Sequence, residues 1–338
     1  MLDAAEMRES VNDGNALERL LAATSERMQQ VNSLILERTE SHVEDVPELA
    51  RYLIEAGGKR LRPMLTIAMA QMFGSPSGDE INFAAAVEFM HDATLLHDDV
   101  VDMSDMRRGQ PAARTVWGNQ ASVLVGDFLL GQAFLMMVET GSLDALGKLA
   151  RAAAIIAEGE VFQLSRAGKL DTTVADYEQI IHAKTATLFE ASTVVGAMAG
   201  GADAAKLAPV GEYGIQLGRA FQLVDDVLDY GGTSGELGKN PGDDLREGKM
   251  TLPVILALQD ADQAERSLLG KTLGDPDATD EDLAGVRQIL NRYDCLGRTL
   301  AEALCAADSA KQALETLPEN ETRQLLADIA DFCVERGG

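Results

Sequence analysis

The sequence EINFAAAVEFMHDATLLHDDVVD, residues 80–102, indicates the fold class and carries the first cluster of charge. Its apolar residues recur at spacings of three and four, which is typical of a helix with a buried face. The stretch ends in Asp98, Asp99 and Asp102. The same helical spacing continues through most of the chain, and no stretch alternates like a strand. We therefore predict an all-α protein.

The periodic segments give the helices that we expect along the chain. Thr173 and Asp176 have the spacing of a capping box, Gly57-Gly58 can end a helix, and Pro63 suits a first turn. The stretches 104–118 and 231–249 look irregular, and both follow an aspartate cluster, where loops often carry function. Besides a first helical segment around 17–35, helices are expected at 47–56, 63–73, 80–103, 119–139, 143–167, 173–200, 204–230, 250–260 and 280–335, the last broken at least twice.

Composition favours helices packed on helices in one large domain. Of the 338 residues, 46% are hydrophobic and only 4% aromatic, so the apolar content is mostly Ala, Leu, Val, Ile and Met. No Pro/Gly/Ser linker divides the chain. We expect a single domain over residues 1–338 in which residues up to about 15 are disordered. The expected shape is one large helical bundle.

The charge and the cysteines exclude several classes of protein. A formal net charge of −26 opposes binding to nucleic acid and to anionic lipid. The three cysteines lack CxxC spacing, which argues against a zinc site or a disulfide framework and fits a reducing cytoplasm. The N-terminus lacks a secretory apolar core, and the most apolar stretch, 121–138, is interrupted by Asp127 and Gln132. We expect no transmembrane segment and a cytoplasmic location.

Two aspartate clusters share the spacing DDxxD. The first is Asp98, Asp99 and Asp102, and the second, in FQLVDDVLD, is Asp225, Asp226 and Asp229. On a helix, residues i and i+4 share a face, so two carboxylates of each cluster point in one direction. Carboxylates about 4 Å apart repel by about 4 kcal/mol at an effective dielectric near 20, so the clusters need a counter-cation.

Hard oxygen ligands select magnesium, which keeps waters and adds substrate phosphates. The alternative is a solvated acidic face, because a three-carboxylate pattern should arise by chance about once in a chain with 55 acidic residues. Two all-aspartate copies on apolar helices, each followed by a basic loop, favour the metal interpretation. All six aspartates are predicted metal residues.

Concentrated positive charge is informative in such an acidic protein, because guanidinium and ammonium groups bind diphosphate oxygens. In GGKRLRP the glycines and Pro63 also mark the end of one helix and the start of the next. The stretch 231–249 is either a flexible linker or a lid that closes over phosphates. His91 lies seven residues before Asp98 and could donate to phosphate, although a lone histidine is more often an interior hydrogen-bonded residue. The basic candidates are Lys59, Arg60, Arg62, Arg107, Arg108, Lys239 and Lys249.

At these residues the sequence resembles the trans-prenyltransferases, the head-to-tail polyprenyl diphosphate synthases. The resemblance covers about residues 50–260 and implies a bundle of long helices around a deep central cavity, usually as a homodimer. The motifs occur in the family's order: GGKRLRP, LLHDDVVDMSDMRRG, GNQASVLVGDFLL, KTATLFEAS, GRAFQLVDDVLDY and GKNPGDDLREGKMTLP.

The resemblance also implies a role for each site residue. It assigns magnesium, three ions in all and replaceable by manganese, to Asp98, Asp102 and Asp225, with Asp99, Asp226 and Asp229 in support. Isopentenyl diphosphate is expected at Lys59, Arg62, His91 and Arg108. The allylic prenyl diphosphate is expected at Arg107, Lys184, Thr185, Gln222, Lys239 and Lys249, the last being the weakest assignment because its spacing varies in the family.

The implied reaction needs no protein nucleophile. The catalytic set Asp98, Asp102, Arg107, Lys184, Asp225 and Lys239 is expected to promote departure of the allylic diphosphate. The double bond of isopentenyl diphosphate attacks the resulting cation, and a proton is then lost. Lys184-Thr185, inside an apolar helix, either kinks it and aims a carbonyl or hydroxyl at the cation or is a locally satisfied polar pair.

Product length follows from two small residues. Ala93 and Thr94 lie five and four residues before Asp98, one turn deeper on the face that carries the growing tail. In short-chain relatives bulky aromatics form a floor there, so their absence implies a long all-trans product, about eight to ten isoprene units. Such a chain is the usual tail of a respiratory quinone, and its release would involve transient membrane contact.

Three other interpretations remain open. The chain could be a medium-chain synthase making farnesyl or geranylgeranyl diphosphate. It could be a class I terpene cyclase, which shares the first aspartate motif but needs no second diphosphate site. It could also be a non-catalytic subunit of a heteromeric prenyl synthase, against which the intact motifs argue.

Overall fold

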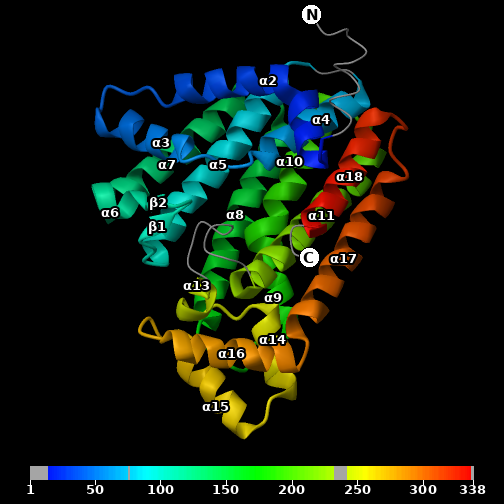
Figure 1. The fold of residues 1–338 in the computed structure, drawn as a ribbon. Coiled ribbons are helices and arrows are strands. Elements are labelled where there is room, and N and C mark those ends of the chain that lie inside the picture. The colour runs from blue at the N-terminus through cyan, green and yellow to red at the C-terminus, as the bar shows by residue number, and fades with distance from the viewer. Residues whose placement is uncertain (1–13, 75–76, 232–241, 336–338) are drawn as a thin grey trace, which may run out of the picture.

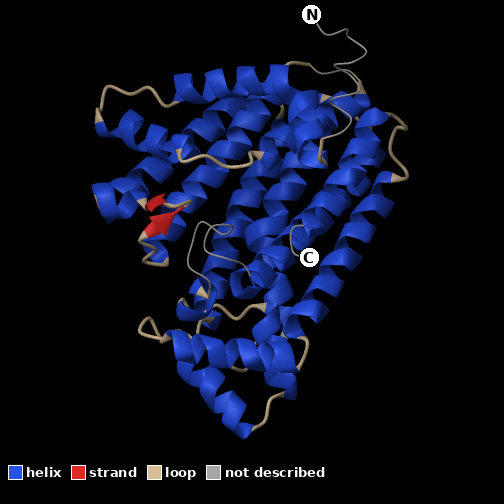
Figure 2. Cartoon of the chain, in the orientation of Figure 1, coloured by secondary structure: helices blue, strands red, loops and turns tan. Residues whose placement is uncertain are grey.

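The structure, a computed structural model, describes residues 14–74, 77–231 and 242–335 and is almost entirely helical (Figures 1 and 2). The long helices α5 and α11 carry the two aspartate motifs. The helices are α2 (Ala16–Arg38), α3 (Asp45–Glu55), α4 (Leu61–Phe73), α5 (Asp79–Val101), α6 (Ala113–Trp117), α7 (Asn119–Glu139), α8 (Leu143–Arg166), α9 (Val174–Ile181), η1 (His182–Ala186), α10 (Thr187–Ala199), α11 (Ala204–Gly231), α13 (Asp243–Arg246), α14 (Leu252–Asp260), α15 (Gln263–Thr272), α16 (Asp280–Arg292), α17 (Cys295–Leu314) and α18 (Glu321–Glu335).

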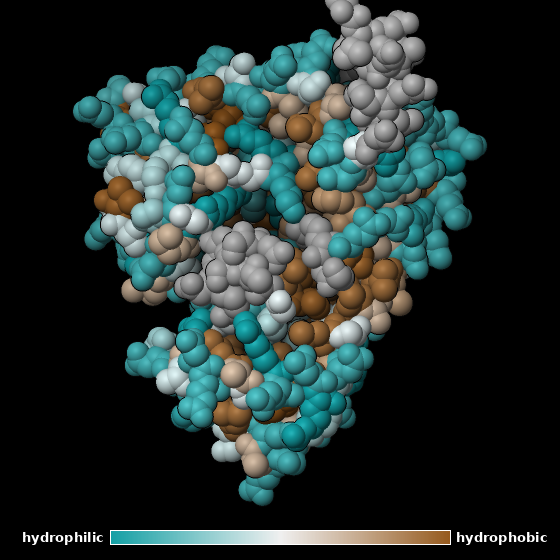
Figure 3. Space-filling view, in the orientation of Figure 1, coloured by the Kyte–Doolittle hydropathy of each residue, from teal (hydrophilic) through white to brown (hydrophobic). Residues whose placement is uncertain are grey.

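Helices α4, α5, α10 and α11 form the centre of the bundle. In Figure 1, α2 crosses one end, α14–α16 lie at the opposite end, and α17 and α18 run along one side. The central helices bury apolar residues on nearly every side, as expected for helices enclosed by other helices. The face in Figure 3 is indented near its middle, where hydrophilic side chains gather.

Close helix packing in the centre depends on small residues. A Cβ added at Gly196 of α10 would lie 2.2 Å from the carbonyl oxygen of Thr66 on α4. A Cβ at Gly218 of α11 would lie 2.7 Å from the Cα of Ala186. Any larger side chain would force these helices apart. The second contact fixes α11, and therefore its aspartates, against the segment that carries Lys184.

The predicted all-α class is confirmed, and so is the capping box at Thr173, whose hydroxyl accepts from Asp176 N–H. Gly57 follows α3 with a φ of 83°, and Pro63 lies in the first turn of α4. The last helical stretch divides into α16, α17 and α18, so the two expected breaks are present. The predicted disordered N-terminus lies almost wholly outside the described residues.

Several expectations about local structure were wrong. The stretch 104–118 is not irregular throughout, because Met106–Arg107 (β1) and Gln110–Pro111 (β2) form a short antiparallel hairpin and α6 follows. Two residues per strand are too few to show an alternating pattern. Helix α15 was not expected, and α13 occupies part of 231–249, although residues 232–241 of that stretch are not described.

The expected helix 173–200 contains a wide turn. Residues His182–Ala186 are π-helical, with Thr187 N–H donating to the His182 carbonyl, and the Thr187 hydroxyl donates to the same oxygen at 2.8 Å. A π turn inserts one extra residue into a helix and is often found at functional sites. The predicted distortion at Lys184-Thr185 therefore exists, as a widening between α9 and α10.

Candidate active site

The first aspartate motif lies at the C-terminal end of α5, where two lysines approach it. Asp102 caps the helix, and its N–H donates to the Asp98 carbonyl at 2.7 Å. Lys184 Nζ lies 3.3 Å from Asp98 Oδ2, and Lys249 Nζ lies 2.9 Å from Asp102 Oδ2. These lysines come from distant parts of the chain, so the fold itself brings positive charge to the motif for which the sequence predicts magnesium.

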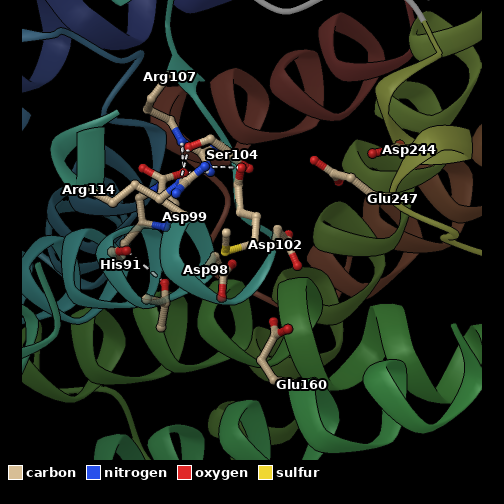
Figure 4. A network of polar contacts seen from close by, with 12 residues as sticks. His91, Asp98, Asp99, Asp102, Ser104, Arg107, Arg114, Glu160, Asp244 and Glu247 are labelled. Atoms are coloured by element: carbon tan, nitrogen blue, oxygen red, sulfur yellow. Dashed lines mark hydrogen bonds and ion pairs between the residues drawn. The ribbon is translucent and has the colours of Figure 1, made fainter. Parts of the chain in front are cut away.

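Carboxylates outside the motif share the same two lysines. Lys184 Nζ is 2.8 Å from Glu160 Oε1 on α8, and Lys249 Nζ contacts Glu247 and lies 3.9 Å from Asp244 Oδ1. Figure 4 shows these acidic side chains around one space. Burial alone would lower the pKa of Lys249, but Asp244, Asp102 and Glu247 outweigh that effect and raise it. Both lysines remain fully charged.

Asp99 points to a different partner from its two neighbours. Its Oδ1 accepts two hydrogen bonds from Arg107, one from Nε at 2.9 Å and one from Nη2, and its side chain is 1% exposed. Burial raises the pKa of Asp99, and the hydrogen bonds from Arg107 oppose the shift. Arg114, drawn beside them in Figure 4, donates through Nε to the Ser104 carbonyl at 2.6 Å and so fixes the turn after the motif.

The second aspartate motif lies inside α11, where its central residue, Asp226, is held by neutral donors. The Tyr177 hydroxyl donates to Asp226 Oδ2 at 2.6 Å, and Gln222 Nε2 donates to Asp226 Oδ1 at 2.8 Å. The Thr185 hydroxyl donates to Gln222 Oε1 at 2.7 Å. Burial, followed by the charge of Asp244, raises the pKa of Asp226 to about 7. This chain of hydrogen bonds connects the π turn to the second motif.

The two motifs belong to one site. Lys249 joins Asp102 of the first motif to Asp244 and Glu247, and those residues follow the second motif in the chain. The Asp229 carbonyl accepts from Gly242 N–H at 2.9 Å, which fixes the start of that segment to α11. Asp244, 3.9 Å from Lys249 Nζ, also acts by its charge on Asp226 in the second motif. Both acidic helices therefore border the site around Lys249.

A cationic region lies beside the acidic one. Burial lowers the pKa of Arg62 to about 10, against the opposing charge of Glu88. Its guanidinium carbon is 4.5 Å from the centre of the Phe189 ring, and its buried Nε has no hydrogen-bond partner among the described residues. A buried guanidinium with an unused donor can receive an anionic oxygen.

Arg108 and His91 complete this cationic region. A Cβ added at Gly58 would lie 2.8 Å from Arg108 Nη2, so the GGKRLRP and DMRRG segments meet. Burial, and then the charges of Arg62, Arg108 and Arg107, hold the pKa of His91 well below its usual range. His91 is therefore neutral at pH 7 and has one N–H to donate, whichever ring nitrogen carries it.

The arrangement fits divalent cations bound together with phosphate. No group of three or more His, Cys, Asp or Glu side chains within 14–74, 77–231 and 242–335 is positioned to hold an ion alone. Magnesium commonly takes one or two carboxylates and completes its shell with water and substrate phosphates. Asp98 and Asp102, which are 15% and 12% exposed, provide such a pair of hard ligands.

The structure brings most of the predicted site residues together, but some lie outside the described residues or have other partners. Lys239 lies outside the described residues, and Lys59 is placed 6.0 Å from the centre of the Phe332 ring. Ala93 is 1% exposed on α5, and the Thr94 hydroxyl donates to the His91 carbonyl at 2.7 Å. Thr185 and Gln222, predicted as substrate ligands, are hydrogen-bonded to each other, so their first role here is to orient Asp226.

Sequence reasoning missed several residues of the site. Asp244 and Glu247 lie within GKNPGDDLREGK, where only the lysines were predicted to bind substrate. Glu160 and Tyr177 gave no separate signal, because one acid and one tyrosine at helical spacing are common. Only the folded chain shows that Glu160 meets Lys184 and that Tyr177 meets Asp226.

An all-helical bundle with two facing aspartate motifs and a cationic region beside them is the architecture of a prenyltransferase. The chain matches the family model described as Polyprenyl synthetase over residues 43–290. It is also 41% identical to octaprenyl diphosphate synthase of Escherichia coli over 320 residues, which are 95% of this chain and 99% of that protein. The chain belongs to the polyprenyl synthetase family.

Solved structures agree with this assignment. A polyprenyl synthase from Caulobacter crescentus, complexed with calcium and isoprenyl diphosphate, superposes with a TM-score of 0.92 at 48% identity, covering 95% of this chain and 98% of that one. A decaprenyl diphosphate synthase from Rhodobacter capsulatus gives a TM-score of 0.91 at 48% identity, covering 95% and 99%. The resemblance inferred from the motifs is confirmed.

Proposed function

We propose that this enzyme condenses isopentenyl diphosphate head to tail (1'-4) with an allylic prenyl diphosphate and makes a long all-trans chain. The observation that carries the proposal is the position of Lys184 and Lys249, which hold two ammonium groups against Asp98 and Asp102. The octaprenyl and decaprenyl synthases among its relatives support a long product. Magnesium, expected as three ions and replaceable by manganese, would lower the barrier by neutralising charge on the departing diphosphate.

The residues divide the work between two diphosphates. Asp98, Asp102 and Asp225 are proposed to hold the metal, with Asp99, Asp226 and Asp229 in support. Arg107, Lys184, Lys249 and Lys239 are proposed to bind the allylic diphosphate, with Thr185 and Gln222 acting through Asp226. Lys59, Arg62, His91 and Arg108 are proposed to bind isopentenyl diphosphate, as the unused Nε of Arg62 favours.

The chemistry follows from this placement. Positive charge around the allylic diphosphate favours breaking its C–O bond, which leaves a delocalised carbocation. The double bond of isopentenyl diphosphate then attacks the cation, and the new cation loses a proton, for which the released diphosphate is the nearest base. A carbonyl at the π turn, residues 182–186, is further proposed to face the cation, because such turns often occur at functional sites.

The reaction requires a direct assay. Purified protein, magnesium, labelled isopentenyl diphosphate and allylic primers of several lengths should give a long polyprenyl diphosphate. A product of 15 or 20 carbons would instead support the medium-chain alternative, and a cyclic hydrocarbon would support a terpene cyclase. Turnover only after adding a second subunit would support the non-catalytic role.

Product length should depend on Ala93. This residue is buried on α5 beneath the first motif, and a large ring there would close the path of a growing tail. We predict that Ala93→Tyr shortens the product by several isoprene units while the first condensation persists. Chromatography of dephosphorylated products measures this, and an unchanged chain length would contradict the proposed path. Leu304→Tyr, on an exposed position of α17, is the control.

We further propose a homodimer formed by α7 and α8. By length and composition α7 is the one helix among the described residues that could span a membrane, although it packs against α5. Its outer side and the adjoining α8 expose the large apolar residues Leu124, Leu135, Val138, Leu143, Val161 and Leu164. A second copy would cover them. Sedimentation of a species at the mass of one chain would contradict the proposal.

We also propose a domain organisation, a cellular location and a role for the product. One continuous buried core includes residues from α2 to α18, which supports a single domain over residues 1–338. The net charge and the reduced cysteines support a cytoplasmic enzyme without affinity for nucleic acid. A long product would serve as a quinone side chain and would require transient membrane contact for release. Extraction of labelled quinone from cells that lack the enzyme tests this role.

A further inference from the structure

Each lysine at the first aspartate motif has a glutamate as a second partner. Lys184 Nζ lies between Asp98 Oδ2, at 3.3 Å, and Glu160 Oε1, at 2.8 Å. Lys249 Nζ lies 2.9 Å from Asp102 Oδ2 and also contacts Glu247. Each ammonium therefore joins one aspartate of the motif to one glutamate outside it.

The glutamates are partly buried and lie on different elements. Glu160 is 20% exposed on α8, and Glu247 is 23% exposed just after α13. Figure 4 shows both pointing toward the space in front of Asp98 and Asp102. Two ammonium groups there face five carboxylates, those of Asp98, Asp102, Glu160, Asp244 and Glu247. The region thus holds more negative charge than the lysines neutralise.

We propose that Glu160 and Glu247 are positioning residues that hold Lys184 and Lys249 beside the first motif until an allylic diphosphate displaces the glutamates. They would also take the lysines back when the pyrophosphate leaves. This inference rests on the proposed function, because it takes both lysines as ligands of the allylic diphosphate.

Electrostatics supports this order of events. A lysine ammonium is a compact charge on a flexible stem, so without a fixed anion it would sample many positions. A divalent cation at Asp98 and Asp102 would repel the ammonium groups, and the glutamates would then be their remaining close anions. A diphosphate offers more charge and more acceptor oxygens than one carboxylate, so it can replace the glutamate at each lysine.

Binding of an unreactive analogue tests the idea without turnover. The probe is an allylic thiolodiphosphate, in which sulfur replaces the bridging oxygen, titrated calorimetrically into the enzyme with magnesium. Glu160→Gln keeps the shape of the side chain and an amide oxygen that can still accept from Lys184, but it removes the competing negative charge. We expect the analogue to bind about three- to tenfold more tightly. The KM for the allylic substrate should fall while the KM for isopentenyl diphosphate stays unchanged.

A double-mutant cycle separates a lysine-mediated effect from a general change of charge. Lys184→Met should weaken binding of the analogue, and adding Glu160→Gln to it should then change nothing further. Glu158→Gln, on an exposed position of the same helix, removes an equal charge and should have no effect. Glu247→Gln with Lys249→Met provides an independent second cycle.

The outcomes distinguish the inference from the proposed function. Normal binding of the analogue to Lys184→Met would contradict the proposed lysine–diphosphate contact itself. Weaker binding in Lys184→Met with unchanged or weaker binding in Glu160→Gln would overturn only the role of the glutamate. Weaker binding in Glu160→Gln is the result expected of a metal ligand. Tightening that persists without Lys184 would also overturn the inference.

Discussion

The first aspartate motif ends α5 beside charged lysines, whereas the second lies inside α11 and is held by a tyrosine and a glutamine. Asp98 and Asp102 are partly exposed and paired with ammonium groups. Asp226 is 2% exposed and accepts from Tyr177 and Gln222. Asp99, the equivalent of Asp226 in the first motif, is 1% exposed and accepts from Arg107. The same DDxxD spacing therefore gives its buried aspartate a charged partner in one motif and neutral partners in the other. Asp98 and Asp102 can therefore exchange one cation for another, whereas Asp226 is a fixed support beside the proposed metal residue Asp225.

The largest effect should come from removing one acid of each motif. We predict that Asp98→Ala and Asp225→Ala each lower turnover by about three orders of magnitude or more, because the metal loses a ligand on one side. Steady-state assays with labelled isopentenyl diphosphate measure this. Asp171→Ala, at an exposed position outside the site, is the control. If either variant kept most of its activity, the metal role of that motif would be refuted.

Stability should depend on pH through Asp226 of the second motif. The pKa of Asp226 is raised by burial from the ordinary 3.8 to about 7. Between these values the folded protein binds a proton that the unfolded chain has released, so this group lowers stability as pH rises from about 4 to 7. Asp226→Asn lacks this loss. The free energy of unfolding of Asp226→Asn, relative to that of the wild type, should therefore increase by up to about 4 kcal/mol as the pH rises from about 4 to 7.

Denaturant unfolding without divalent metal, at several pH values, measures the difference between Asp226→Asn and wild type. Asp171→Asn removes the same charge from an exposed position and should show no comparable trend. A difference that stays constant from pH 4 to 8 would show that Asp226 is ionised throughout and that the second motif is not a low-polarity support.

A smaller effect should distinguish two buried tyrosines. Tyr177→Phe removes the donor to Asp226 Oδ2 and should lower turnover about tenfold, because Asp226 loses one of the two hydrogen bonds that orient it. Tyr213 donates to the Leu326 carbonyl at 2.9 Å, away from the site. Tyr213→Phe should cost about 1 kcal/mol of stability with normal turnover. Equal turnover in both variants would remove the positioning role of Tyr177.

Much of the fold could be predicted because long amphipathic helices leave a clear periodic signal. The ends of α7, α8 and α11 fall within a residue of expectation, and the capping box at Thr173 marked the start of α9. The hairpin at 106–111 and the four-residue α13 were missed because their hydrogen bonds are few and local. Short elements depend on their surroundings more than on their own pattern.

The candidate site was predictable as far as its residues carried a repeated motif. Asp98, Asp102 and Arg62 were named because spacing and local charge mark them. The partners Glu160 and Tyr177 depend on which helix faces lie together, and that information is absent from a single stretch of sequence. Sequence can indicate which groups do the chemistry, but it does not show what holds them between reactions.

The wide turn at residues 182–186 has a consequence for deletions in this helix. Each residue removed from a helix rotates everything beyond it by about 100°. A chain shortened by one residue there could form an unbroken regular helix, yet Tyr177 and Phe189 could no longer both face their present neighbours. The extra residue thus sets the rotation of α10 relative to α9. The enzyme would tolerate a change of side chain at this turn more readily than a change of length.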